Sequence, residues 1–169
     1  MLKPQLFIAD TKDFCPSLIR PVKNRDQKPF GGLWTSSFDI EYKSGWVSFR
    51  ESHNFDIPTQ KWRGFVLIPK RKVRIYVIDS YDDLKRLVNK YPHQPYKGLP
   101  FRYLQDVVFP DYEAISKDYD AIHLTNRGEY QTRNMTYGGA HLYGWDFEST
   151  LWFRDCFTRV TRTTFKTNV

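Results

Sequence analysis

The sequence predicts a single α+β domain whose core is a mainly antiparallel, split β-sheet with a few flanking helices. Two observations support this prediction. The segments predicted as strands and those predicted as helices are grouped along the chain instead of alternating, which is typical of α+β folds. The chain has 169 residues, a length that corresponds to one domain and can enclose a hydrophobic core. We therefore treat residues 1–169 as one domain.

The predicted strands are short runs rich in apolar and β-branched residues. The two clearest are residues 64–69 (GFVLIP) and 72–79 (KVRIYVID). The second alternates with a period of two residues, which places successive side chains on opposite faces of a sheet. Further short strands are expected at residues 5–9, 33–36, 121–125, 149–153 and 157–164.

Residues 80–91 (SYDDLKRLVNKY) carry the strongest helix signal. Ser80 is the expected N-cap, and two aspartates follow in the first turn. Leu84, Leu87 and Val88 form one apolar stripe at helical spacing, so this helix is expected to pack on the core.

Two more helices are expected. One lies within 109–118, with Asp111 as its cap, and one lies within 42–51, opening near Ser44. Proline, glycine and polar residues mark the connections. Turns or loops are expected at residues 10–27 (with a short helix), 29–32, 92–100 and 126–139, the last being polar and a candidate flexible loop.

Composition narrows the class of protein. Aromatic residues make up 17% of the chain, enough to fill a core and also to line a cleft that stacks on planar ligands. The net charge of +7 favours polyanionic partners such as nucleic acid, nucleotides or acidic protein surfaces, although a charge that serves only solubility remains an alternative. The densest basic run, residues 70–74, is interpreted as a hairpin turn between two strands.

Targeting and metal signals are absent from the sequence. The two cysteines, Cys15 and Cys156, are far apart and belong to no Cys/His metal pattern, so no metal is expected. No apolar run is long enough for a transmembrane helix, so no membrane partner is expected. Residues 1–9 have no signal-peptide core. We expect a cytoplasmic protein, acting in a host cytoplasm if a secretion system exports it.

Two motifs could carry chemistry. The first is Gly31-Gly32-Leu33-Trp34-Thr35-Ser36, followed by Lys43-Ser44-Gly45-Trp46, in which glycines let the backbone approach a ligand. The second places Asp146 and Glu148 at the start of an apolar strand beside aromatic residues. A carboxylate there can bind a ribose hydroxyl or stabilise an oxocarbenium-like centre. Taken singly, each motif also fits an ordinary turn.

In this order and at this separation, the two motifs resemble signatures of ADP-ribosyltransferases of the diphtheria-toxin and poly(ADP-ribose) polymerase type. Residues 31–46 are similar to the family's Gly-rich turn, its Gly-[Ile/Leu]-Tyr-Phe-[Ala/Ser] strand and the later Lys-Ser-aromatic element. Residues 148–153 (ESTLWF) are similar to the strand that opens with the family's catalytic Glu. The resemblance covers about a quarter of the chain.

The resemblance implies an NAD-dependent mono-ADP-ribosyltransferase, a glycosyltransferase that uses NAD as a substrate and needs no metal. It would be a toxin, an effector or a phage-type modifier of host molecules. Glu148 would be catalytic, holding a ribose hydroxyl while nicotinamide leaves. The nicotinamide would lie against the backbone at 31–33 and stack on an aromatic ring. The residues implied for NAD binding are Gly31, Gly32, Leu33, Trp34, Ser36, Ser44 and Trp46.

The loop before the catalytic strand would recognise the macromolecular target, which is nucleic acid or an acidic protein surface. Arg127, Tyr130 and Arg133 suit such a partner. The sequence departs from the family on its first strand, where residues 6–11 contain neither the His nor the Arg that binds NAD. Arg20 or Arg25 from the following loop could serve instead.

Three alternatives remain open. A non-enzymatic basic module could bind nucleic acid or a host or defence protein, and an NAD glycohydrolase could use the same pocket with water as acceptor. The pair His123 and His141 has a faint similarity to two-histidine phosphoesterases, although its spacing is too short. The transferase interpretation requires that Glu148, Gly32 and Trp34 meet in one cleft.

Overall fold

The structure is a computed structural model that describes residues 2–25, 27–39, 43–52, 63–100, 105–133 and 139–163. Its helices are α1 (Gly45–Ser52), α2 (Tyr81–Lys90), α3 (Tyr112–Asp118) and α4 (Asn126–Thr132), with a short 3-10 helix at Pro16–Leu18. Its strands are β1 (Gln5–Ala9), β2 (Arg20–Lys23), β3 (Phe30–Asp39), β4 (Lys43–Ser44), β5 (Arg63–Pro69), β6 (Ile75–Ile78), β7 (Pro92–His93), β8 (Phe109–Pro110), β9 (Ala121–Leu124), β10 (Ser149–Trp152) and β11 (Phe157–Thr163).

Nine of these strands form one sheet within the described residues, and the α+β fold class predicted from the sequence is confirmed. The strand order is β11-β5-β1-β3-β10-β9-β6, with β2 and β4 each paired to β3. Every pairing in the sheet is antiparallel except that of β6 with β9. The strands β7 and β8 form a separate small sheet.

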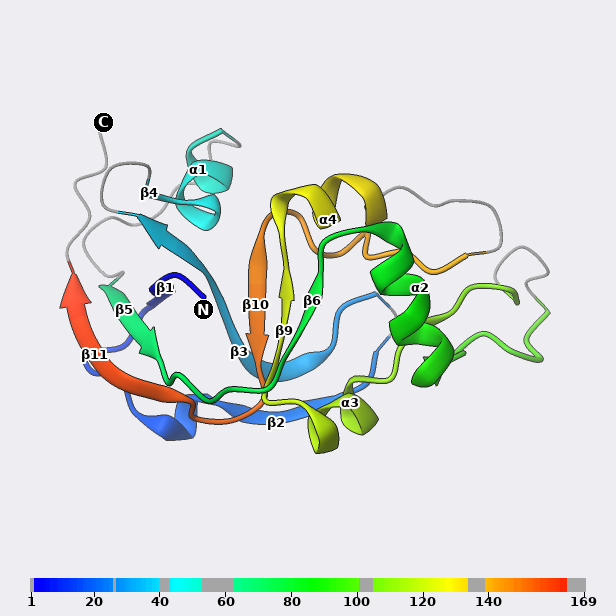
Figure 1. The fold of residues 1–169 in the computed structure, drawn as a ribbon, viewed down its shortest axis with the longest axis horizontal. Coiled ribbons are helices and arrows are strands. Elements are labelled where there is room, and N and C mark those ends of the chain that lie inside the picture. The colour runs from blue at the N-terminus through cyan, green and yellow to red at the C-terminus, as the bar shows by residue number, and fades with distance from the viewer. Residues whose placement is uncertain are drawn as a thin grey trace.

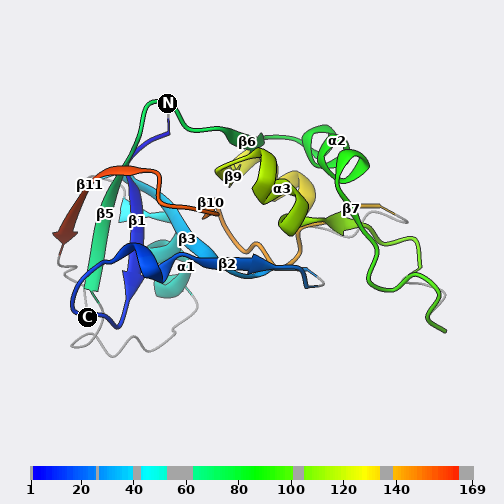
Figure 2. The same cartoon turned by 90° about the horizontal axis from the view of Figure 1, so that it is seen from below.

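Strand β3 joins the two halves of the sheet. Its residues 33–35 pair with β10, and its residues 36–37 pair with β1. The strands β1, β5 and β11 therefore lie on one side of β3, and β10, β9 and β6 lie on the other (Figures 1 and 2). The split sheet expected from the sequence is thus organised around one ten-residue strand.

Alternation along the strands divides the hydrophobic core between two faces. The larger cluster, which we name the helix-side core, combines sheet residues such as Ile122 and Leu151 with side chains from α2 and α3. The smaller cluster, the second core, lies on the other face and contains Leu33, Leu67 and Trp152. Because Leu151 and Trp152 are neighbours on β10, they point to opposite faces and enter different cores.

Helices α2 and α3 agree with the caps predicted from the sequence. The side chain of Ser80 accepts a hydrogen bond from the backbone of Asp83, and Leu84, Leu87 and Val88 are buried. Asp111 caps α3, which begins at Tyr112 and so starts later than expected. The preceding residues belong to β8.

Several local predictions need correction. Residues 70–74 are not a hairpin turn, because β5 pairs with β1 and β11 whereas β6 pairs with β9 at the far side of the sheet. Residues 29–32 are not an isolated turn, because β3 already begins at Phe30. The stretch 10–27 contains β2 as well as a short helix; its Pro21 is tolerated because β2 pairs on one side only, with β3. Part of the expected loop 126–139 is helix α4. The expected start of α1 at residue 42 lies outside the described residues.

Gly128 obscured the signal of helix α4 in the sequence. Thr125 caps the helix, since its hydroxyl accepts a hydrogen bond from the backbone of Gly128 at 3.0 Å. A Cβ atom on Gly128 would collide with the carbonyl oxygen of Ile78 at the end of β6. Glycine here is therefore a packing requirement, not a helix terminator.

Gly31 has a comparable role on β3. Its φ is +80°, in the left-handed region, and an added Cβ would overlap the carbonyl oxygen of Pro21 on β2. Gly98 has a similar φ of +83°, but an added Cβ there meets no atom within 4 Å. No helix within the described residues has the length and apolar character needed to cross a membrane.

These two glycines give a test of the β2–β3 contact. Gly31→Ala should lower the free energy of unfolding by about 2–4 kcal/mol, because backbone strain and a collision add together. Gly98→Ala should lower it by about 1 kcal/mol, from the backbone term alone. Denaturant unfolding of both variants measures the difference, and equal losses would contradict the close packing of β2 on β3.

Candidate active site

Glu148 lies immediately before β10 and opposite Ser37 of β3. Thr150 pairs with Thr35, so the same antiparallel register continues to Glu148 and Ser37. The Glu148 carboxylate accepts a hydrogen bond from the Ser37 backbone N–H at 2.9 Å on Oε2, and one from the Ser37 hydroxyl at 2.9 Å on Oε1. Glu148 is only 7% exposed, so these two bonds replace much of the hydration that a buried carboxylate loses.

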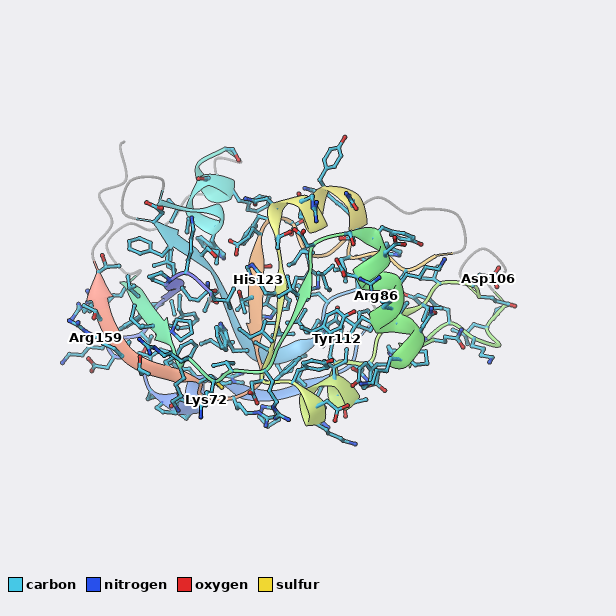
Figure 3. All side chains as sticks on the ribbon, viewed as in Figure 1. Lys72, Arg86, Asp106, Tyr112, His123 and Arg159 are labelled. Atoms are coloured by element: carbon cyan, nitrogen blue, oxygen red, sulfur yellow. The ribbon has the colours of Figure 1, made fainter. Side chains whose placement is uncertain are left out.

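His123 of β9 is the second titratable group at this point. Its Nδ1 lies 3.6 Å from Oε1 of Glu148 and 2.9 Å from the hydroxyl oxygen of Thr150. His123 pairs with Thr150 across the β9–β10 ladder, which places both side chains on the face of the sheet that carries Glu148. Figure 3 shows His123 near the middle of the molecule, on the sheet.

A chain of hydrogen bonds connects Glu148 to the second core. The indole N–H of Trp152 donates to the hydroxyl oxygen of Thr35 at 2.9 Å. The Thr35 hydroxyl donates to the Gln5 side-chain oxygen at 2.7 Å, and the Gln5 side-chain nitrogen lies 3.3 Å from the Ser37 hydroxyl oxygen.

The donor and acceptor roles in this series of hydrogen bonds follow from the indole N–H of Trp152. An indole nitrogen can only donate, so the hydroxyl of Thr35 must accept and its own hydrogen must go to another acceptor, Gln5. That bond orients the Gln5 amide with its nitrogen toward Ser37. The Ser37 hydroxyl therefore accepts from Gln5 and donates to Glu148, so every donor in the chain points toward the carboxylate.

Glu148 and His123 line a cavity of about 340 Å³ at the end of β3. This volume is at the small end of the range for ligand pockets, about 300–1,000 Å³. Its walls come from the N-terminal segment, the end of β3, the β4–α1 junction and the β9–α4 junction. The lining residues are Lys3, Ser37, Phe38, Asp39, Ser44, Gly45, Ser48, His123, Thr125, Asn126 and Glu148.

Burial shifts the two titratable groups in opposite directions. It raises the pKa of Glu148, because the charged carboxylate loses water, and the two hydrogen bonds from Ser37 oppose that rise. Burial lowers the pKa of His123 to about 4, against the opposing attraction of Asp79. At neutral pH the imidazole is therefore uncharged. The site thus offers a fixed carboxylate that can accept a hydrogen bond or stabilise a cation, beside an uncharged imidazole.

Three of the residues predicted for NAD binding gather near this cavity. Ser44 lines it together with Glu148. Ser36 is buried, and its hydroxyl oxygen lies 3.5 Å from the backbone nitrogen of Trp46, where α1 begins. These three residues therefore position the β4–α1 junction, and only Ser44 is part of the cavity wall.

The other four predicted NAD-binding residues do not meet Glu148. Gly31, Gly32, Leu33 and Trp34 lie at the opposite end of β3, and Gly32 is about 16 Å of extended strand from Ser37. Leu33 belongs to the second core, and Gly32 abuts Leu151.

Trp34 is turned to the other face of the sheet. Its ring packs on Trp145 with centroids 4.6 Å apart, and the Lys28 ammonium lies 4.3 Å from its centroid. Of the two rings that the resemblance offered for stacking on nicotinamide, Trp34 or Trp46, Trp34 is therefore excluded. The requirement that Glu148, Gly32 and Trp34 meet in one cleft is not met. The sequence placed these residues together because one motif spans them, but a strand extends them along its length.

The residues expected to recognise a target lie on α4 and at its end. Arg127 forms an ion pair with Asp79, and Arg133 bonds Glu129 at 3.0 Å. Tyr130 is 81% exposed and projects from the helix. Arg127 and Arg133 thus form local ion pairs, although the Arg127 side chain is still 66% exposed. Tyr130 is the more exposed of the two side chains that present most of their surface to solvent.

The candidates for the missing early His or Arg lie away from the cavity. Arg20 pairs with Gly32 on the β2–β3 ladder, and the guanidinium of Arg25 lies over the ring of Phe30 at 5.5 Å. Both are therefore at the opposite end of β3 from Glu148. Nor does His141 join His123 at the cavity, since its ring packs on Phe109 at 5.1 Å.

Sequence reasoning missed Ser37 and the role of His123. Their signal was the alternation of polar residues on short strands: Thr35 and Ser37 on one strand, His123 and Thr125 on another. Polar side chains at alternate positions share one face, which here is the face of Glu148. The motif interpretation assigned Ser36, one position off, and so chose the wrong face.

No group of three or more His, Cys, Asp or Glu side chains in the described part of the chain could hold a metal ion. Cys15 is exposed and Cys156 is buried, and both are free thiols. No protein-family model matches the chain, and neither the curated proteins nor the solved structures contain a match. The functional interpretation therefore depends on the geometry of the site.

The titration of His123 can be tested through stability. Its pKa is lowered to about 4, so the folded state favours the neutral imidazole. That contribution is fully present above the ordinary histidine pKa, near 6.5, and is lost as the pH falls toward 4. Relative to His123→Gln, the wild type should lose about 2–3 kcal/mol of unfolding free energy over this interval.

Denaturant unfolding at a series of pH values measures this difference. Glu148 acts in the opposite sense, because a raised carboxyl pKa stabilises the fold at low pH and the benefit disappears as the pH rises through that pKa. Parallel pH curves for wild type and His123→Gln would show that the imidazole is not buried in its neutral form.

Proposed function

We propose that this chain is an ADP-ribosyltransferase that transfers ADP-ribose from NAD to a macromolecular target, with Glu148 as its catalytic carboxylate. The observation that supports this most is the attachment of Glu148: a buried carboxylate in a cavity wall, fixed by two hydrogen bonds from one residue of β3. The resemblance of the glutamate-containing strand to the family's catalytic strand gives the same residue the same role.

In the proposed reaction the bond between the ribose anomeric carbon and the nicotinamide nitrogen breaks, and the electron pair leaves with nicotinamide. Positive charge then spreads over the anomeric carbon and the ring oxygen. Glu148 accepts a hydrogen bond from a ribose hydroxyl and stabilises this charge. A lone pair on the target forms the new bond to the anomeric carbon, and the target loses a proton. The neutral His123 in the same cavity can accept that proton.

Gly32 and Trp34 do not share a cleft with Glu148, so the NAD site implied by the motif is not retained, and from the resemblance the proposal keeps only Glu148 and Ser44. The proposed nicotinamide site is therefore a different one. It consists of the end of β3 and the start of α1, where Ser44 and Ser48 line the cavity and offer hydroxyl groups. This junction lies close to the catalytic strand, since a Cβ added at Gly45 would be in van der Waals contact with the Glu148 carbonyl oxygen at 3.5 Å.

The target is proposed to approach over α4. The first residue of this helix, Asn126, and its cap, Thr125, both line the cavity. Tyr130 stands one turn further along and is largely exposed. With a net charge of +7, the surface favours nucleic acid or an acidic protein. An NAD glycohydrolase would use the same site with water as the acceptor.

The first experiment measures nicotinamide release from NAD, with and without cell lysate. Glu148→Gln keeps the shape of the side chain but removes its charge, so release should fall at least about 100-fold. Asp146→Asn is the matched control, because this carboxylate lies two residues away, contacts Arg133 and does not line the cavity. It should keep near wild-type release.

Stimulation by lysate that depends on Glu148 would support transfer to a macromolecule, and release without stimulation would support the glycohydrolase. Equal release by wild type and Glu148→Gln would eliminate Glu148 as the catalytic group. A folded wild type that neither binds NAD nor releases nicotinamide would leave the basic binding module as the better account.

Tyr130 separates target recognition from NAD chemistry. Tyr130→Ala should reduce modification of the target about tenfold, since stacking of a base on an aromatic ring is worth about 1–3 kcal/mol. Release of nicotinamide to water should not change, because Tyr130 does not line the cavity. Labelled ADP-ribose incorporated into lysate measures the first quantity. Unchanged incorporation would show that the target is recognised elsewhere.

A further inference from the structure

A second cavity adjoins the first across His123. Its volume is about 430 Å³, and His123 lines both cavities. It lies over β6 and beneath the connection from β5 to β6, and so on the same face of the sheet as Glu148. The two cavities are therefore neighbours on one face of the sheet, and the side chain of His123 lies between them.

The floor of the second cavity is apolar. The parallel register pairs Ile75 with Ala121 and Val77 with His123, which places both β6 side chains on the face of His123. Val77 lies on β6, the last strand in the order of the large sheet, and is 45% exposed, so its apolar side chain is accessible from the cavity. Val73 continues the floor. An apolar surface of this kind suits a planar base or a sugar ring.

The rim of the second cavity is basic. Lys70 and Arg71, which follow β5 directly, line it and are exposed. Neither forms an ion pair within the described part of the chain. The described lining residues include no Asp or Glu, whereas the first cavity has Asp39 and Glu148. Lys72 follows on the same connection (Figure 3).

We propose that the second cavity is a nucleotide subsite, in which Lys70 and Arg71 bind phosphate and the apolar floor holds the base or ribose. This inference rests on the proposed function for the connection to Glu148, and it names the part of the substrate that lies beyond His123. A phosphate group supplies negative charge opposite the two cations of the rim, and the guanidinium of Arg71 can bind it through two parallel hydrogen bonds.

Two sources could supply the nucleotide. One is the adenosine diphosphate half of NAD, whose nicotinamide half would occupy the first cavity. The other is a nucleotide of a nucleic-acid target, brought to the first cavity from the side of β6. Both present the same chemistry, a phosphate ester attached to a ring system.

The test is equilibrium binding of three probes: ADP, NAD and a single-stranded oligonucleotide. The variant Lys70→Ala/Arg71→Ala removes two positive charges at the cavity. The control Lys97→Ala/Lys117→Ala removes two exposed charges that line neither cavity. The first variant should bind its probe about tenfold more weakly than wild type, as expected for the loss of charge-assisted phosphate contacts, and the control should not.

Weaker binding of ADP and NAD would assign the subsite to the dinucleotide, and weaker binding of the oligonucleotide alone would assign it to the target. Equal weakening in both double variants, or no binding of any probe to wild type, would overturn the proposal. Val77→Asp adds a second test that should leave the fold intact, because the side chain is 45% exposed. A carboxylate on the cavity floor should repel the same probe.

Glu148→Gln separates this proposal from the proposed function. It should keep the binding of ADP while nicotinamide release is lost. A wild type that binds ADP through Lys70 and Arg71 but releases no nicotinamide would retain the subsite and reject the transferase. If nicotinamide release depends on Glu148 but ADP binding is unchanged in Lys70→Ala/Arg71→Ala, the transferase is retained and the subsite is rejected.

Discussion

Strand β3 is the constraint on which the rest of the structure depends. Within ten residues it pairs with β2, β10, β1 and β4, so among the described residues the two halves of the large sheet meet only through it. The alternation along β3 determines where its own side chains point. Leu33 enters the second core, Trp34 packs on the helix-side core, and Ser37 lines the cavity. A close contact with β2 at Gly31 fixes one end, and the carboxylate of Glu148 occupies the other.

The candidate site exists where the ladder between β3 and β10 stops. The ladder ends at the pair of Thr150 and Thr35. Two residues further along β3, the backbone N–H of Ser37 donates to the Glu148 carboxylate and not to a backbone carbonyl of β10. A buried carboxylate is costly unless it is hydrogen-bonded, and Ser37 supplies two donors from one residue. His123 lies close enough to interact with Glu148, yet burial lowers its pKa to about 4, so the imidazole brings no positive charge to the site at neutral pH.

The sequence predicted the fold class and the elements with strong local signals, such as the Ser80 cap and the strand at 64–69. The strand predicted at 72–79 forms only over Ile75–Ile78. Glu148 was predicted as catalytic because a carboxylate before an apolar strand is conspicuous in the sequence itself. The structure shows that it lines a cavity, and its catalytic role stays a prediction. The cavity partners were not predictable in the same way. Ser37 and His123 meet Glu148 only through long-range register, and a single sequence carries no information on which strands are neighbours.

The hydrogen-bonded chain from Trp152 to Glu148 has a practical consequence. Trp152 is completely buried, and its indole N–H is the first donor of a series that ends on the candidate catalytic carboxylate. Protonation of the carboxylate, or its engagement by a substrate hydroxyl, changes the polarity felt along the whole series. The fluorescence emission of Trp152, obtained as the difference between the spectra of wild type and Trp152→Phe, would then report whether a ligand occupies the neighbouring cavity.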